Sequence, residues 1–348
     1  MAIVIALDAM GGDHAPGVVI DGAARALCER SDLRFLLFGD AGRVRPLLER
    51  HPVLAAASEL RHTDAFVAAE TRPSLALRQG RRSSMRLAID AVKAGEARAA
   101  VSAGNTGALM AMGKVVLRTL EGIDRPAIAT ALPSRREPVV MLDLGANVDC
   151  SPQHLFQFAV MGEVYARTVL GVARPRVALL NIGTEEIKGE SGVREAARLL
   201  RNSPLDIDFR GFVEGDDIPT GKVDVVVTDG FTGNVALKVA EGASRFYAGT
   251  LRDAFRSGLR AKLGYLLARP ALERVRRRLD PRRYNGAMLL GLSGVVVKSH
   301  GGTDAFGFAH AVLSAARIVE QGTNERIIEE MRRVAASIAA PRLRVAAS

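Results

Sequence analysis

One structural unit recurs along this chain and limits the folds that are open to it. Each copy has a short apolar run, a glycine-rich turn and a stretch compatible with a helix. In the fullest copy, Val225–Val227 favours a buried strand, Asp229–Asn234 supplies turn residues, and a helix-like segment begins at Val235. Alternation of strands with helices predicts an α/β fold with a mostly parallel sheet and helices on both faces. Further copies follow the apolar runs at residues 3–7, 99–101, 139–142, 177–180 and 295–297.

The turns of these units are the first candidates for a binding site. In open α/β sheets the turns at the carboxyl ends of the strands gather, and ligands bind there. The N–H groups at a helix start attract anions. We therefore expect the turns to form one site that binds phosphate and substrate through these residues: Asp8, Gly11, Gly12, His14, Gly104, Asn105, Thr106, Gly145, Asn147, Gly183, Thr184, Gly233 and His300.

Two polar residues in the turns suit catalysis. Lys188 follows an apolar run and has three glutamates beside it. On a surface it would form a weak ion pair, whereas in a pocket it would stabilise phosphate or an oxyanion. Asn234 could donate hydrogen bonds to the same oxyanion, or it could cap the following helix. With Asp229, which begins the same turn, they form the predicted catalytic set: Lys188, Asn234 and Asp229.

His14 and Cys150 are weaker candidates for chemistry. His14 lies at a helix start, and a lone histidine is more often structural than catalytic. Cys150 also precedes a helix start, where thiolates are favoured. No histidine follows it at a useful spacing, so a covalent intermediate on this thiol is not expected.

The sequence lacks the motifs of the common cofactor sites. It has no GxxxxGK[ST] loop and no GxGxxG fingerprint. The two cysteines and six histidines have neither a disulfide framework nor a metal-ligand spacing. We therefore expect no cofactor and no metal.

The composition narrows the location and the partners of the protein. Aromatic residues make up 5% of the chain and tryptophan is absent, which argues against a stacking platform for nucleic acid. No run reaches the ~18 apolar residues of a membrane-spanning helix. The amino terminus lacks the basic region of a signal peptide. These observations predict a cytoplasmic protein that does not bind nucleic acid.

The net charge of +10 is concentrated in one segment. Residues 245–283 contain twelve Lys or Arg and three Asp or Glu. Apolar side chains recur there at helical spacing. This pattern predicts a basic amphipathic helical hairpin that protrudes from a single domain of residues 1–348. The predicted membrane or partner surface consists of Leu251, Phe255, Leu259, Leu263, Leu266, Arg276 and Arg277.

Two interpretations of this hairpin stay open. An apolar stripe flanked by arginines suits an anionic membrane surface. The same stripe could instead pack on the protein itself or on the second subunit of a dimer, because helical periodicity alone does not separate core from interface. Both would hold if the hairpin dimerises at its base and contacts lipid at its tip.

Six motifs, taken in order, resemble those of the bacterial phosphate acyltransferases of phospholipid synthesis. They are ALDAMGGDHAP, SAGNTGALMA, LDLGANVDC, NIGTEEIKGE, VVTDGFTGNVALK and GVVVKSHGGTDA. The likeness extends from about Ile3 to Ala336, which is nearly the whole chain. The resemblance implies a Rossmann-like three-layer α/β/α sandwich that is related to the phosphotransacetylases and usually forms a homodimer.

By the same resemblance, the protein transfers a long-chain fatty acyl group from acyl carrier protein to inorganic phosphate. The product is an acyl phosphate, which a membrane glycerol-3-phosphate acyltransferase then uses. The peripheral association of this family with the inner face of the cell membrane fits the basic hairpin. Since phosphate held beside the thioester can attack it directly, no enzyme nucleophile is needed.

Three other functions remain compatible with parts of the sequence. A short-chain phosphotransacetylase would act on acyl-CoA and would not use long-chain acyl carrier protein. A non-catalytic scaffold would bind membrane through the hairpin without forming acyl phosphate. A dehydrogenase fits the fold class alone, and it would bind NAD.

Overall fold

The computed structural model describes residues 2–345, and it confirms the predicted fold class. Within that range eleven strands form one sheet: β1 (Ile3–Asp8), β2 (Leu33–Gly39), β3 (Ser58–His62), β4 (Ala99–Ser102), β5 (Ala127–Leu132), β6 (Val139–Leu142), β7 (Arg176–Leu180), β8 (Asp208–Val213), β9 (Val225–Val227), β10 (Ala287–Leu290) and β11 (Val295–Lys298). The described helices are α1 (Gly17–Glu29), α2 (Ala41–Leu48), α3 (Pro52–Ala56), α4 (Pro73–Gln79), α5 (Ser84–Lys93), α6 (Thr106–Leu117), α7 (Pro152–Val169), α8 (Ser191–Arg201), α9 (Gly230–Arg256), α10 (Leu259–Leu279), α11 (Ala305–Glu320) and α12 (Thr323–Val345). Short 3₁₀ turns are η1 (Gly80–Arg82), η2 (Gly215–Thr220) and η3 (Pro281–Tyr284).

The sheet consists of two parallel blocks that run in opposite directions. β3, β2, β1, β4 and β11 are parallel to one another, as are β6, β9, β7 and β8. Between the blocks, three antiparallel pairings reverse the strand direction: β11 with β10, β10 with β5, and β5 with β6. The carboxyl ends of the two blocks therefore lie at opposite edges of the sheet.

This topology corrects the prediction that all the turns gather at one place. The turns after β1, β4 and β11 lie at one edge, which we call the Lys298 edge after the last residue of β11. The turns after β6, β7 and β9 lie at the other edge, which we call the Asp143 edge after the residue that follows β6. The expectation was wrong because β10, which takes part in two of the three reversals, was not predicted from the sequence.

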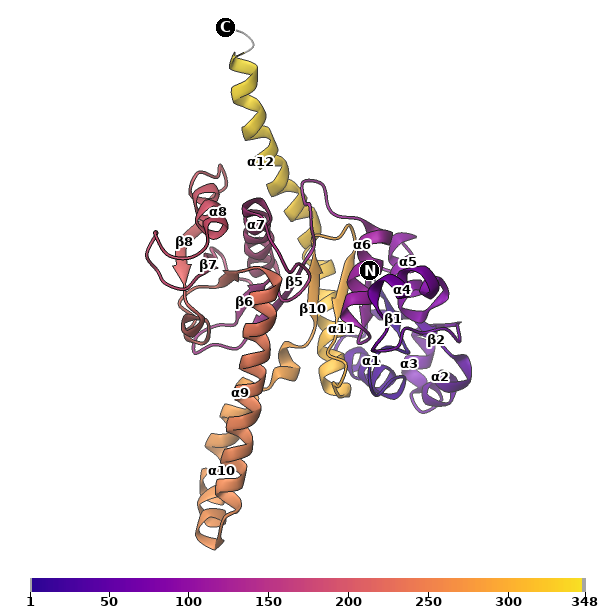
Figure 1. Cartoon of the computed structure of the whole chain (residues 1–348). Coiled ribbons are helices and arrows are strands. Elements are labelled where there is room, and N and C mark those ends of the chain that lie inside the picture. Colours follow the sequence, from indigo (N-terminus) through magenta and orange to yellow (C-terminus); the bar gives the residue numbers. More distant parts are fainter. Residues whose placement is uncertain (1, 346–348) are drawn as a thin grey trace.

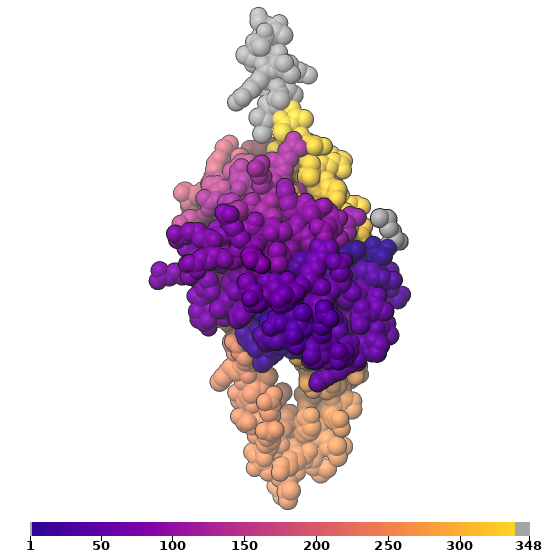
Figure 2. Space-filling model, turned by 90° about the vertical axis from the view of Figure 1, so that its right-hand side faces the viewer, coloured from indigo at the N-terminus to yellow at the C-terminus, as the bar shows by residue number. Residues whose placement is uncertain are grey.

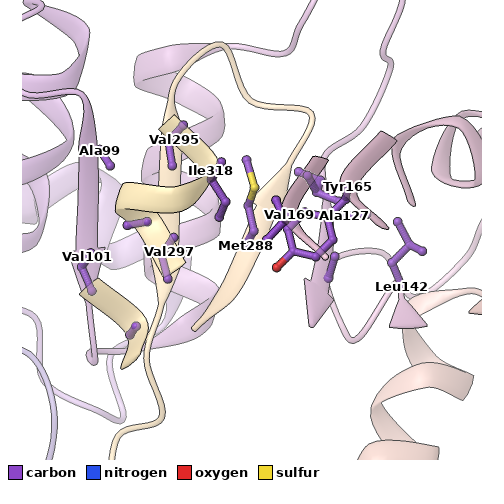
Figure 3. Packing of buried hydrophobic residues seen from close by; sticks show 14 of the residues in the cluster. Ala99, Val101, Ala127, Leu142, Tyr165, Val169, Met288, Val295, Val297 and Ile318 are labelled. Carbon is purple, nitrogen blue, oxygen red and sulfur yellow. The ribbon is translucent and has the colours of Figure 1, made fainter. Parts of the chain in front are cut away.

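Alternate side chains of each strand serve different faces of the sheet, as expected for extended chain. Val297 and Met288 belong to the large core beneath α1, α7, α11 and α12, where Ile318 of α11 lies beside them (Figure 3). The adjacent residues Val296 of β11 and Leu289 of β10 point to the other face and belong to a cluster beneath α5 and α6. Residues of α9 pack on the same face farther along the sheet. Consequently α6 and α9 cover one face together.

α9 and α10 form a helical hairpin that projects from the body of the molecule (Figure 1). Figure 2 shows them as two legs that meet at the tip. Helix α9 continues without a break from Gly230, so the first leg begins at the sheet and not at residue 245. Most of the large hydrophobic side chains that residues 2–345 expose lie on these two helices.

The predicted apolar stripe of the hairpin is largely exposed. Phe255 is the exception, because it is half-buried and its ring packs edge-on against Tyr265 with a centroid distance of 5.5 Å. That contact ties α9 to α10 near the tip. The remaining members of the stripe are exposed: Leu251, Leu259, Leu263 and Leu266.

Candidate active site

The glycine-rich turns of the Lys298 edge touch one another. The backbone N–H of Asp13, in the turn after β1, donates to the carbonyl oxygen of Gly301, in the turn after β11, at 3.0 Å. Gly12 has a φ of +105°, which favours glycine. A Cβ at this position would also approach the Cβ of Ala103 to 2.9 Å. The three turns therefore form one continuous surface.

Asp8 organises these turns from beneath. Its buried carboxylate accepts hydrogen bonds from Ser84 Oγ at 2.6 Å, Ser102 Oγ at 2.7 Å and the Met10 N–H at 3.3 Å. Burial raises the pKa of Asp8, and the hydrogen bonds act against that shift. Gly11 must be small, because a Cβ there would lie 2.4 Å from Asp8 Oδ2. The structure thus places Asp8 under the turn, with both carboxylate oxygens engaged by the protein.

The turn after β4, which includes Gly104, opens directly into α6. Asn105 Oδ1 accepts from the Ala108 N–H at 2.9 Å and caps the helix, while its Nδ2 donates to carbonyl groups of a preceding loop. Thr106 and Gly107 follow in the first turn, where backbone N–H groups have no intrahelical acceptor. These N–H groups and the helix dipole favour an anion at this position.

Lys298 is a functional candidate that the sequence pattern did not single out. It ends β11 on the face that α6 and α9 cover, because it follows Val296 by two residues. Its Nζ donates to the carbonyl oxygen of Ala103 at 3.3 Å and to that of Ser299. Ala103 belongs to the turn that precedes α6, so the ammonium group lies beside the start of that helix. The signal in the sequence was a charge at the end of the apolar run VVVK.

Several charges act on the ammonium group of Lys298. Burial lowers its pKa to about 8, the carboxylates of Asp13 and Asp8 act against that shift, and Lys238 of α9 adds to it. Lys238 is exposed and donates to Glu241 at 3.0 Å. An amine that titrates near neutral pH can stabilise an anion and can also exchange a proton with it. The Lys298 edge therefore combines a helix start with a largely buried cation.

Asn234 lies on α9, which starts at the Asp143 edge and crosses the face that α6 also covers. It precedes Lys238 by four residues, so the two side chains lie on one side of the helix. Lys238 is close enough to Lys298 for its charge to lower the pKa of that amine, so this part of α9 lies near the Lys298 edge. Asn234 is exposed, and Gly145 lies next to it.

The Asp143 edge is built around a carboxylate and not around a cation. Asp143 is buried and accepts from the Ile128 N–H at 2.9 Å, the Asn147 N–H at 2.7 Å and Asn147 Nδ2 at 2.9 Å. Burial raises its pKa against these hydrogen bonds. Asn147 Nδ2 also donates to Pro126 O at 2.8 Å. Gly233 packs on the backbone of Asp143, where a Cβ would clash with the carbonyl oxygen. Asn147 and Gly233 thus hold this edge together.

Asp229 and Lys188 also lie at the Asp143 edge. Asp229 Oδ1 accepts from the Thr232 N–H at 2.8 Å and caps α9. Lys188, in the turn after β7, lies 3.4 Å from a carboxylate oxygen of Glu185 and keeps 48% of its side chain exposed. The structure does not bring Lys188 together with the turns of the Lys298 edge, and its catalytic role stays a prediction. Its turn also contains Gly183 and Thr184.

The two predicted histidines lie at the Lys298 edge, and both are exposed. His14 belongs to the turn after β1. His300 Nδ1 accepts from the Gly302 N–H at 3.1 Å, and the backbone N–H of His300 donates to Asn285 Oδ1 at 2.9 Å. Cys150 lies at the Asp143 edge, where burial and neighbouring carboxylates raise the pKa of its thiol to about 11. A thiol with this pKa is protonated at neutral pH and is a poor nucleophile.

The arginines at the end of α10 lie at the base of the hairpin. Arg276 and Arg277 are exposed in its last turn. Arg278 Nη2 donates to Ser134 O at 3.1 Å and to Arg136 O at 3.0 Å, which ties α10 to the loop between β5 and β6. Within residues 2–345, Arg278 thus has hydrogen bonds to this loop that Arg276 and Arg277 lack.

Residues 2–345 contain neither a metal-binding cluster nor a membrane-spanning helix. No group of three or more His, Cys, Asp or Glu side chains is arranged there to hold a metal ion. No helix of residues 2–345 has the length and the apolar character that crossing a bilayer requires.

The chain is similar to known proteins over almost its full length. The family model described as "Fatty acid synthesis protein" matches residues 3–326. The phosphate acyltransferase of Rhodospirillum centenum is 60% identical over 341 residues, which cover 97% of this chain and 96% of that protein. The phosphate acyltransferase of Paramagnetospirillum magneticum is 57% identical over 333 residues, with coverages of 96% and 95%.

Solved structures share the fold at low sequence identity. A phosphotransacetylase from Streptococcus pyogenes has a TM-score of 0.64 and 18% identity, and the match covers 92% of this chain and 94% of that chain. A branched-chain phosphotransacylase from Enterococcus faecalis V583 has a TM-score of 0.54 and 15% identity, with coverages of 90% and 98%. With the family model and the close relatives, the predicted resemblance is confirmed: the chain belongs to the phosphate acyltransferase family, and it is an enzyme of the acyltransferase class.

Proposed function

We propose that this enzyme transfers a long-chain fatty acyl group from acyl-acyl carrier protein to inorganic phosphate. One observation supports the phosphate half of the reaction most directly: Lys298 lies beside the start of α6. A cation and the first-turn N–H groups of a helix together suit a small anion. The relatives named phosphate acyltransferase support the same class of reaction.

In this proposal the bound hydrogen phosphate attacks the thioester directly. A phosphate oxygen forms a bond to the carbonyl carbon, the C–S bond breaks, and the electron pair leaves with the sulfur of the carrier. The proton that phosphate loses ends on that sulfur or in solvent. Lys298 and the N–H groups of α6 would hold the phosphate and neutralise its charge, and the fixed position reduces the entropic cost of attack.

Asn234 is the proposed donor to the oxyanion that forms on the thioester carbonyl. It lies one helical turn before Lys238, whose charge reaches Lys298, and its amide can donate two hydrogen bonds. Asp229 caps α9 and would act by positioning Asn234. Lys188 would add a positive charge from the turn after β7. These roles do not need an enzyme nucleophile, so the high pKa of the Cys150 thiol is no obstacle.

We further propose that the enzyme is cytoplasmic and associates peripherally with the anionic inner face of the membrane. There, as a homodimer, it would pass acyl phosphate to a membrane glycerol-3-phosphate acyltransferase. Exposed leucines near the tip of the hairpin, such as Leu263 and Leu266, support contact with lipid. Phe246 and Tyr247, which are exposed nearer the body, support a contact with the second subunit.

Replacing Leu263 and Leu266 by glutamate tests the membrane contact. Two charges at the tip should weaken sedimentation with anionic phospholipid vesicles, because apolar burial would be lost and like charges would repel. Val53→Glu is the matched control, since this valine is exposed on α3, away from the hairpin. If the tip variant sediments as the unaltered protein does, the tip is not the lipid contact.

The enzymatic proposal is tested by incubating the protein with palmitoyl-acyl carrier protein and phosphate, with acetyl-CoA in a parallel reaction. Phosphate-dependent release of free carrier protein is the expected result. Turnover of acetyl-CoA without turnover of the carrier substrate would favour the short-chain phosphotransacetylase. Vesicle binding without either reaction would favour the scaffold.

A further inference from the structure

A hollow of about 430 Å³ lies where the base of the hairpin meets α1 and the start of α11. It borders the turn after β11 through Asp304, but neither Lys298 nor the start of α6 lines it. Five arginines, three acidic residues and one aromatic ring line it, and we call it the arginine hollow: Arg25, Arg276, Arg277, Arg282, Arg283, Glu273, Asp280, Asp304 and Phe306.

One of these arginines is neutralised and fixes the floor of the hollow. Arg282 forms ion pairs with Asp280 and Asp304, each at 2.6 Å. Asp304 also accepts from the Gly307 N–H at 3.0 Å and so caps α11. These contacts anchor η3 to α11, and because two carboxylates face one guanidinium group, the cluster carries a net charge of −1.

The other four arginines outweigh the acids, so the residues that line the hollow carry a net charge of +2. Arg276 reaches Glu273 only at 3.9 Å. Within residues 2–345, no carboxylate lies within 4.0 Å of a side-chain nitrogen of Arg25, Arg277 or Arg283. Guanidinium groups that share a concave surface reinforce one another's potential and attract an anion.

The ring of Phe306 packs against two of the arginines of the hollow and restricts their guanidinium groups. The guanidinium carbon of Arg282 lies 5.0 Å from the centre of the Phe306 ring, and that of Arg283 lies 5.7 Å from it. Stacking on an aromatic face restricts a guanidinium group and leaves its N–H edge available to a ligand. The site is therefore partly preorganised.

We propose that the arginine hollow binds the phosphate group of a second ligand. The planar fork of a guanidinium group matches two phosphate oxygens, and several forks with no acid partner favour a doubly charged group over a carboxylate. The volume far exceeds the roughly 30 Å³ that a water molecule occupies in the liquid. The hollow thus has room for a phosphate with an attached organic group. A soluble phosphate ester and a phospholipid headgroup share this chemistry.

Removal of two charges tests the proposal on the full-length protein. The test variant is Arg277→Gln with Arg283→Gln, and the matched control is Arg45→Gln with Arg50→Gln, two exposed arginines of α2 and the segment after it. Equal thermal midpoints would show that all three proteins are folded. Binding of radiolabelled inorganic phosphate is measured by dialysis, and binding of vesicles is measured by sedimentation with phosphatidylglycerol or phosphatidylcholine.

The hollow variant should lose one class of phosphate site or bind phosphatidylglycerol vesicles about tenfold more weakly, while the control does neither. Loss of phosphate binding alone would identify a soluble ligand, and loss of vesicle binding alone would identify a lipid headgroup. If neither changes relative to the control, the proposal is overturned. A raised KM for acyl carrier protein with both unchanged would assign the hollow to protein docking instead. Since both readouts are equilibrium binding, their outcome is independent of whether the acyl transfer proceeds.

Discussion

The two edges of the sheet share a local architecture and differ in one buried charge. At each edge a buried aspartate, Asp8 or Asp143, accepts hydrogen bonds from its surroundings. At each edge a G-x-T-G turn opens a helix, α6 or α9, with a capping Asn105 or Asp229. Among the residues that the structure describes, only the Lys298 edge adds a largely buried cation, Lys298 itself.

The comparison shows that a glycine-rich turn at a helix start does not by itself make a phosphate site, and that a buried cation must be added to it. A glycine-rich turn at a helix start supplies N–H groups wherever it occurs, and in this fold it occurs at both edges. The carboxylate of Asp143 accepts five hydrogen bonds, and Lys188 at that edge is exposed beside Glu185. The cation that would hold phosphate is therefore Lys298. Because Lys298 is largely buried, its attraction for an anion is stronger than that of an exposed lysine.

Replacing Lys298 should have the largest effect on catalysis. Lys298→Met keeps the length of the side chain and removes the charge, so turnover of palmitoyl-acyl carrier protein should fall about a hundredfold or more. The matched control is Lys222→Met, because Lys222 is exposed and only pairs with Asp217. An unchanged rate in Lys298→Met would remove Lys298 from the site.

Removing Asp143 should act on stability first. Asp143→Ala leaves several buried N–H groups without an acceptor, which should lower the free energy of unfolding by about 3 kcal/mol. Urea denaturation measures this loss. Lys298→Met should not be destabilised at neutral pH, because it removes the cost of burying a charge. Equal losses in the two variants would mean that the edges do not differ as described.

Lys188→Ala should have a smaller effect on the rate. Its ammonium group is half-exposed and shared with Glu185, so loss of its charge should lower turnover by about tenfold, or ~1.4 kcal/mol. A steady-state assay under the conditions used for Lys298→Met gives the comparison. No loss at all would make Lys188 a surface ion pair, and a loss larger than that of Lys298→Met would move the chemistry to the Asp143 edge.

The dependence of the rate and of the stability on pH should differ between the unaltered enzyme and Lys298→Met, and this is the smallest of the expected effects. Lys298 has a pKa of about 8 in the folded protein, below its ordinary 10.5, so the rate should fall as pH rises through about 8 and the amine loses its proton. Between about pH 8 and pH 10.5, Lys298 is protonated in the unfolded chain and largely deprotonated in the folded protein. Lys298 therefore makes the free energy of unfolding rise with pH in this range. Lys298→Met should lose both effects. A rate profile that keeps its alkaline limb in Lys298→Met would assign that limb to another group.

Much of the fold could be predicted from the sequence. Apolar runs ended by glycine located β1, β4, β6, β7, β9 and β11, because a buried strand needs such a run and a turn must follow it. The periodic leucines located the hairpin. The relative direction of the two blocks could not be read, since it depends on how β10 and β5 pair across more than 150 residues of sequence. Local pattern carries no information on that pairing.

The candidate site was predicted in part for the same reason. The turns themselves were predicted. The sequence did not reveal that the polar atoms of Asp8 and Asn147 form hydrogen bonds within the protein, because their partners Ser84 and Pro126 are distant in the chain. Lys298 looked like the end of an ordinary strand. Its importance comes from burial beside α6, which only the assembled sheet produces.

The most direct test of where phosphate binds is the dependence of the rate on phosphate concentration in Lys298→Met and Lys188→Ala, measured side by side with the unaltered enzyme. If phosphate is held at the Lys298 edge, the KM for phosphate rises about tenfold or more in Lys298→Met and stays unchanged in Lys188→Ala. An unchanged KM in Lys298→Met with a raised KM in Lys188→Ala would contradict that assignment and place the phosphate at the Asp143 edge.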